Sequence, residues 1–253
     1  MNDLLIIKDL TVAVGNKLLV DRVSFEVPPG KIVAIAGGSG SGKTTIGLSV
    51  LGLLPSALSV KQGSIIFENK NLLKLSAQEL RQVRGDRIGM VFQEPLSAFD
   101  PLFTIGQQLE EVLVAHTHLS GQERYKKILE TLAEVELPDP RRAYGAYPHQ
   151  LSGGMRQRAM VAQAMVAGPS LIIADEPTSS LDVTLQAKVM EIFRRLKNKI
   201  SILLITHDLG MIANVADDLV ILRQGQIVEK GPVARIYDQP CHEYTKALIE
   251  AFQ

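Results

Sequence analysis

A run of small residues that ends in a lysine and a threonine is the first candidate for chemistry: Gly37, Gly38, Ser39, Gly40, Ser41, Gly42, Lys43 and Thr44. An apolar, β-branched segment at 32–35 precedes it, and residues 46–51 can continue as a helix. This is the strand–loop–helix context of a phosphate-binding loop. Glycines lack a Cβ, so successive N–H groups can point at phosphate oxygens, and the positive end of the following helix adds attraction. We expect Lys43 to reach the β- and γ-phosphates of a nucleotide and the Thr44 hydroxyl to bind Mg²⁺.

A second candidate is the pair of acids, Asp175 and Glu176, that ends the apolar run at 171–174. Segments that are hydrophobic on both faces suit buried parallel strands, and α/β folds bind ligands at the carboxyl ends of such strands. We expect Asp175 to hold Mg²⁺ directly or through water. Glu176 would then face the γ-phosphate and act on the attacking water. The pattern therefore predicts nucleotide hydrolysis.

Further segments make the chain resemble the nucleotide-binding subunit of an ABC transporter. The family's signature is matched by Leu151–Gln157, its Q-loop by Gln93, its D-loop by Ser180–Asp182 and its switch histidine by His207. These motifs occur in the expected order over nearly the whole chain. By resemblance, the fold is α/β, with a P-loop NTPase (RecA-like) core, an antiparallel β subdomain and an inserted helical subdomain at about 95–168. Residues 1–253 would form a single nucleotide-binding domain.

The resemblance also implies roles for individual residues. Lys43, Gln93, Glu176 and His207 would be catalytic, and Thr44, Gln93 and Asp175 would bind Mg²⁺. ATP would be contacted by every residue of the P-loop from Gly37 to Thr45. Further contacts would come from Ser152, Gly153, Gly154 and Asp182. In this family, the residues matched by Ser152 and Gly154 contact the γ-phosphate held by the P-loop of a facing subunit, so neither chain alone completes a site.

Four segments outside the shared ATP site resemble ATPases of the peptide and nickel importers: 91–101, 147–150, 181–187 and 241–248. By this resemblance the chain binds and hydrolyses ATP to power uptake of nickel, another chelated metal, dipeptides or oligopeptides. The short C-terminus favours a metal importer. One position departs from the family pattern, because Val14 stands where an aromatic residue usually stacks on adenine. Valine offers apolar contact without a π-face, so adenine affinity or base selectivity would be weaker.

The resemblance implies several partners. These are a second ATPase subunit, identical or homologous, two membrane-spanning permease subunits and, indirectly, an extracytoplasmic solute-binding protein. The chain would lie at the cytoplasmic face of the membrane. An alternative is a soluble ATPase of the same superfamily that acts on nucleic acid or ribosomes, but such proteins usually carry two cassettes or a long coiled-coil insertion. A non-hydrolysing partner is a third reading, against which the intact Lys43, Asp175, Glu176 and His207 argue.

Composition agrees with these expectations. The 253 residues include 27 basic and 27 acidic side chains, a balance that argues against a surface built for a nucleic-acid backbone. No apolar stretch approaches the roughly 18–20 residues that cross a bilayer, and the start does not resemble a signal peptide. Short strands are expected at 4–7, 18–20, 24–27 and 64–67, helices after capping boxes at 76–79 and 120–123, and a hairpin from 219–222 and 227–229.

Overall fold

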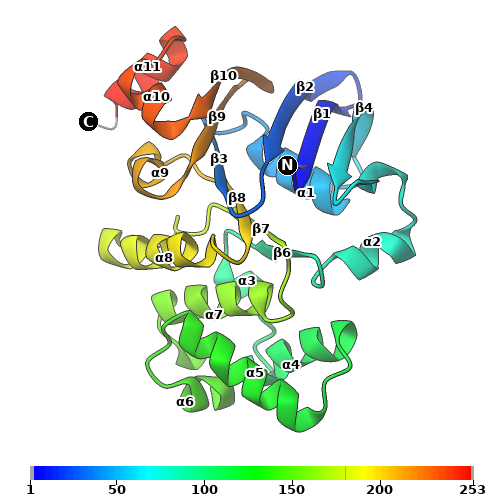
Figure 1. The fold of residues 1–253 in the computed structure, drawn as a ribbon, viewed down its shortest axis with the longest axis vertical. Coiled ribbons are helices and arrows are strands. Elements are labelled where there is room, and N and C mark those ends of the chain that lie inside the picture. The colour runs from blue at the N-terminus through cyan, green and yellow to red at the C-terminus, as the bar shows by residue number, and fades with distance from the viewer. Residues whose placement is uncertain (1–2, 180, 252–253) are drawn as a thin grey trace. The chain divides into compact units, whose positions relative to one another are not determined.

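The computed structural model describes residues 3–179 and 181–251. The chain divides into two compact units, whose helices and strands are labelled in Figure 1. The sheet unit consists of Met1–Leu80 and Phe193–Gln253, and the helical unit consists of Arg81–Ile192. Within the described residues, no helix combines the length and the apolar character needed to span a bilayer.

An antiparallel sheet opens the sheet unit. Its strands are β1 (Leu5–Val14), β2 (Lys17–Val27), β4 (Leu58–Phe67) and β5 (Lys70–Asn71), in the order β2-β1-β4-β5. The two strands expected at 18–20 and 24–27 are one strand, β2. It continues through Arg22, which has a φ of 49°, and the pairing of β1 with β2 shifts register along its length. A local irregularity within one strand thus replaces the break between two strands.

The second sheet of this unit carries the glycine-rich loop. β3 (Ile32–Gly37) pairs in parallel with β8 (Ser201–Ile205) and β9 (Asp218–Arg223), and β9 pairs antiparallel with β10 (Gln226–Pro232), which confirms the expected hairpin. Every residue of β3 is buried, which explains its continuous aliphatic character. The helices of the unit are η1 (Leu72–Lys74), α1 (Lys43–Leu51), α9 (Leu209–Val215), α10 (Val233–Asp238) and α11 (Glu243–Glu250). α2 (Ala77–Val83) leads from this unit into the next.

The helical unit contains a pair of parallel strands, and the helices α3 to α7 lie between these two strands in the sequence. β6 (Ile88–Val91) pairs with β7 (Leu171–Asp175). Its helices are α3 (Pro95–Ala98), α4 (Ile105–His116), α5 (Gly121–Glu134), α6 (Pro140–Gly145), η2 (Pro148–Gln150) and α7 (Gly153–Met165). α8 (Val183–Leu196) runs from this unit into the sheet unit's second segment. The helices α3 to α7 fall within the stretch expected to be helical.

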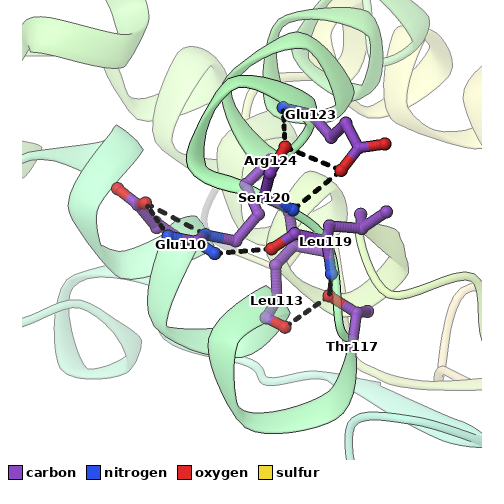
Figure 2. Close-up of polar contacts among 7 residues, drawn as sticks. All are labelled: Glu110, Leu113, Thr117, Leu119, Ser120, Glu123 and Arg124. Atoms are coloured by element: carbon purple, nitrogen blue, oxygen red, sulfur yellow. Dashed lines mark hydrogen bonds and ion pairs between the residues drawn. The ribbon is translucent and has the colours of Figure 1, made fainter.

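The connection between α4 and α5 shows how local sequence sets these helices (Figure 2). Ser120 accepts a hydrogen bond from the Glu123 N–H while the Glu123 carboxylate accepts one from the Ser120 N–H, the capping box expected from the sequence. Arg124 donates to the Leu119 carbonyl at 2.7 Å and pairs with Glu110 at 3.0 Å. These contacts fix the start of α5 against α4.

Candidate functional site

The glycine-rich loop leaves β3 in a conformation that only glycine can adopt at two points. Gly37 has a φ of 154°, and a Cβ there would lie 2.2 Å from the Leu222 carbonyl oxygen. Gly42, which precedes α1, has a φ of 101°, and a Cβ there would lie 2.7 Å from the Leu19 carbonyl oxygen. The loop therefore packs closely on the backbone of β2 and β9 at these two points, which leaves no room for a side chain there.

Lys43 folds back over the start of this loop. Its ammonium donates hydrogen bonds to the carbonyl oxygens of Gly37 at 2.8 Å and Gly38 at 3.0 Å, and the residue is only 7% exposed. Beside it lies a cavity of about 200 Å³ lined by Leu19 and by most of the loop residues predicted to contact the nucleotide: Gly40, Ser41, Gly42, Lys43, Thr44 and Thr45. The loop thus presents a pre-folded, positively charged pocket at the N-terminus of α1.

His207 lies in the same unit, two residues beyond the end of β8, and its side chain is exposed. Hydrogen bonds of Thr206 and Asp208 stabilise the turn around it. The N–H of Asp208 donates to the Thr206 hydroxyl at 3.1 Å, and the Asp208 carboxylate caps α9 through the Met211 N–H. The Tyr237 hydroxyl donates to the Leu209 carbonyl, and burial, together with the Asp208 charge, raises the pKa of Tyr237 to about 12. This hydroxyl therefore stays protonated at physiological pH.

The acids lie in the helical unit, at the end of its parallel strand pair. Asp175 is the buried last residue of β7, and Glu176 follows with a φ of 48°, a left-handed conformation that costs a non-glycine residue energy. Val91, the last residue of β6, is paired with Ala174, so Gln93 and the two acids leave the pair at the same carboxyl edge. The structure thus places these three side chains on neighbouring segments. Strained backbone at such an edge is typical of functional positions.

The signature segment begins α7. Ser152 is its N-cap, with the hydroxyl accepting from the Met155 N–H at 3.4 Å. Ser152 and Gly153 are exposed, whereas Gly154 is buried. In the D-loop, Ser180 lies outside the described residues. The Asp182 carboxylate accepts from the Leu185 N–H at 3.0 Å, so it caps the start of α8 and is itself exposed.

The predicted site residues are therefore divided between the two units. The sheet unit contains the P-loop, residues 37–45, and also His207. The helical unit contains the other predicted site residues: Gln93, Ser152–Gly154, Asp175, Glu176 and Asp182. Val14, at the adenine-stacking position, ends β1 and is partly exposed. Oxygen donors of the kind that Mg²⁺ prefers are present as the Thr44 hydroxyl, the Gln93 amide and the Asp175 carboxylate. Their chemistry fits the proposed metal.

Sequence reasoning missed one residue at the loop. The Gly38 N–H donates to the hydroxyl of Tyr244, on α11, at 3.0 Å. The two residues are 206 positions apart, and no periodicity or spacing in the sequence brings them together. The only sequence signal was the resemblance of residues 241–248 to importer ATPases, which assigned the tyrosine no contact.

Comparison with known proteins places these motifs in a family. The sequence family described as ABC transporter matches residues 20–179. Among curated proteins, a dipeptide transport ATP-binding protein, DppD of Bacillus subtilis, is 44% identical over 238 residues, 93% of this chain and 71% of its own length. The oligopeptide transport ATP-binding protein OppD of the same organism is 43% identical over 253 residues, 97% of this chain and 71% of its own.

A peptidoglycan transport ATP-binding protein, YejF of Agrobacterium fabrum, is 44% identical over 255 residues, 98% of this chain. The chain spans about half, 47%, of that relative's length. Among solved structures, one similar chain is the ATP-binding cassette MJ0796, a post-hydrolysis dimer bound to ADP and phosphate. Its TM-score is 0.79 at 29% identity, and the match covers 90% of this chain and 98% of the MJ0796 chain. A second solved structure, cbiO1 of Clostridium perfringens, has a TM-score of 0.82 at 23% identity, and the match covers 94% of this chain and 92% of the cbiO1 chain. At this identity the likeness supports the fold alone.

Proposed function

Because the chain belongs to the ABC transporter family, we propose that it is the ATP-binding and ATP-hydrolysing subunit of an importer complex that takes up dipeptides or oligopeptides. One observation carries the proposal: the pre-folded loop in which Lys43 bridges two P-loop carbonyls at the N-terminus of α1. Such a loop binds polyphosphate through backbone N–H groups, with the lysine supplying a point charge.

The remaining roles follow from the positions of the side chains. Glu176, at the end of β7, would polarise the attacking water, and His207 would act at the γ-phosphate. Thr44, Gln93 and Asp175 would hold Mg²⁺, which neutralises charge that develops on the phosphates.

The exposed N-terminus of α7 supports a shared nucleotide site. The first N–H groups of a helix have no partner within it, and here they follow a serine that is exposed and adjoin an exposed glycine. Ser152, Gly153 and Gly154 would contact the γ-phosphate bound to a second ATPase subunit, with Asp182 nearby. ATP would hold the two subunits together. Its hydrolysis removes charge-assisted hydrogen bonds and so favours their separation.

The solute class is inferred from the relatives. DppD and OppD are named for dipeptide and oligopeptide transport, and YejF for peptidoglycan transport, which favours peptides over the metal solute that the sequence analysis favoured. The chain would act with two membrane-spanning permease subunits and an extracytoplasmic binding protein, at the cytoplasmic side of the membrane. A soluble ATPase that acts on nucleic acid or ribosomes is not favoured.

Co-purification from membranes, followed by uptake assays, tests this proposal. The tagged chain should bring down two integral membrane subunits, and deletion of its gene should abolish uptake of labelled di- or tripeptides. Uptake of ⁶³Ni²⁺ should be unchanged. If the deletion abolished nickel uptake and left peptide uptake normal, the solute would be nickel. If the tagged chain co-purified with ribosomes and with no membrane subunit, the importer assignment would be overturned.

A further inference from the structure

Helix α11 reaches the P-loop through the side chain of Tyr244. The Tyr244 hydroxyl accepts the hydrogen bond from Gly38 described above, at 3.0 Å. The approach is tight, because a Cβ added to Gly38 would lie 3.2 Å from the same hydroxyl oxygen. Gly38 has no positive φ that would require glycine, so the close contact with Tyr244 is the steric demand at this position.

Two contacts hold Tyr244, one to its ring and one to its backbone. The guanidinium carbon of Arg223, at the end of β9, lies 5.0 Å from the ring centroid, a cation–π contact. The N–H of Tyr244 donates to His242 Nδ1 at 3.0 Å. The hydroxyl is therefore presented to the loop by a fixed ring.

A buried carboxylate anchors the start of α11. Glu229, on β10, accepts hydrogen bonds from the N–H groups of Cys241 at 3.0 Å and His242 at 3.1 Å, and pairs with Arg235 at 3.4 Å. Burial alone would raise the pKa of Glu229, but these N–H groups and the Arg235 charge hold it below its ordinary value. The anchor is thus ionised at neutral pH, and it connects the tyrosine to the same sheet that carries β3.

We propose that Tyr244 is a positioning residue that pre-organises the P-loop for polyphosphate. This inference rests on the proposed nucleotide site. Lys43 holds the carbonyls of Gly37 and Gly38, and Tyr244 holds the Gly38 N–H, so the first turn of the loop is fixed from both sides before a ligand arrives. Removing the hydroxyl transfers the cost of ordering this segment to the binding step. Nucleotide affinity falls, while turnover at saturation, which depends on other groups, does not.

The test is Tyr244→Phe in the full chain, because phenylalanine keeps the ring and its contact with Arg223. We expect the Kd for Mg–ADP, measured by calorimetry, to rise about two- to tenfold, the effect of one lost hydrogen bond. In the assembled complex, KM for ATP should rise by the same factor with kcat within about twofold. The matched control is Tyr125→Phe, which removes the hydroxyl of a partly exposed tyrosine on α5 and should leave Kd and KM unchanged.

Two further measurements separate this role from general destabilisation. Amide hydrogen exchange of the nucleotide-free chain should accelerate at Gly38 in Tyr244→Phe and stay unchanged in α5. Gly38→Ala, which presses a methyl group against the hydroxyl, should weaken Mg–ADP binding less in the Tyr244→Phe background than in the wild type. Wild-type affinity and exchange in Tyr244→Phe would overturn the inference and leave the nucleotide site standing. A wild-type chain that bound no nucleotide would overturn both.

Discussion

A Cβ added to Gly154 would lie 3.0 Å from both terminal methyl carbons of Leu185, on α8. The second glycine of the signature therefore packs α7 against α8 within the helical unit, besides any contact with a partner's nucleotide. Gly153 is different: it is exposed, and a Cβ there would meet only a Leu181 methyl at 3.9 Å. A substitution that tests the shared site belongs at Gly153, because a side chain at Gly154 would disturb this chain's own packing.

Gly153→Asp should abolish ATP-driven dimerisation and coupled transport, because a carboxylate would face the γ-phosphate held by the partner subunit. ATP binding to the isolated chain should persist. Sedimentation with and without ATP measures the first effect and calorimetry the second. The matched control is Gly145→Asp, at another exposed glycine of the helical unit where an added Cβ meets nothing within 4 Å. Normal dimerisation of Gly153→Asp would show that the signature does not complete a composite site.

Glu176→Gln should leave ATP binding intact and lower hydrolysis about 100-fold or more, because the attacking water loses its polarising carboxylate. Glutamine has the same shape and meets the same backbone strain at a φ of 48°, so the fold should be unaffected. The variant should also accumulate a closed dimer with ATP. Phosphate release and sedimentation report the two effects, with Glu130→Gln on the exposed face of α5 as the control. Turnover at the wild-type rate would remove Glu176 from the mechanism.

Lys43→Ala should weaken ATP binding about 10- to 100-fold, because it removes the charge that would face the phosphates together with the two bonds that fold the loop. The loss of these bonds predicts a second effect, faster amide exchange in residues 37–42 even without nucleotide. Lys61→Ala, at an exposed position on β4, is the control. Unchanged affinity for ATP would contradict the assignment of the P-loop.

Features encoded by neighbouring residues could be predicted from the sequence. The strand–loop–helix at β3 and α1 follows from an aliphatic run, glycines and a lysine in immediate succession. The α5 capping box depends on two residues three positions apart, Ser120 and Glu123. The hairpin of β9 and β10 was equally readable, since a glycine-containing turn separates two apolar runs.

The contacts that depend on tertiary packing could not be predicted. The sequence predicted two separate strands around Arg22, yet β2 continues through it, and its N–H donates to the Thr11 hydroxyl on the neighbouring strand. Tyr244 reaches Gly38 only because the fold places α11 beside the loop that follows β3. Such relationships arise from packing between distant segments, on which local propensity and periodicity carry no information.

Asp217 provides a test of pH dependence at the base of the sheet that positions the P-loop. Its carboxylate accepts a hydrogen bond from the Ile32 N–H, the first residue of β3, at 2.9 Å, and it pairs with Lys197 at 3.0 Å. Burial opposes ionisation, but this N–H and the lysine charge hold the pKa of Asp217 below its ordinary value of 3.8. The ionised form is thus favoured in the folded protein. Its contribution to stability is present above about pH 4 and is lost as the pH falls through the lowered pKa.

Asp217→Asn should therefore lower the free energy of unfolding by about 1–2 kcal/mol at pH 7, the order expected for hydrogen bonds to a partly screened charge. The difference from the wild type should shrink steadily below pH 4, because protonation of Asp217 makes the two chains alike at this position. Urea unfolding at a series of pH values measures it. The control is Asp238→Asn, at an exposed aspartate that ends α10 in the same unit and should show little effect at any pH. A stability difference that stayed constant down to pH 3 would contradict the ionised anchor at the start of β3.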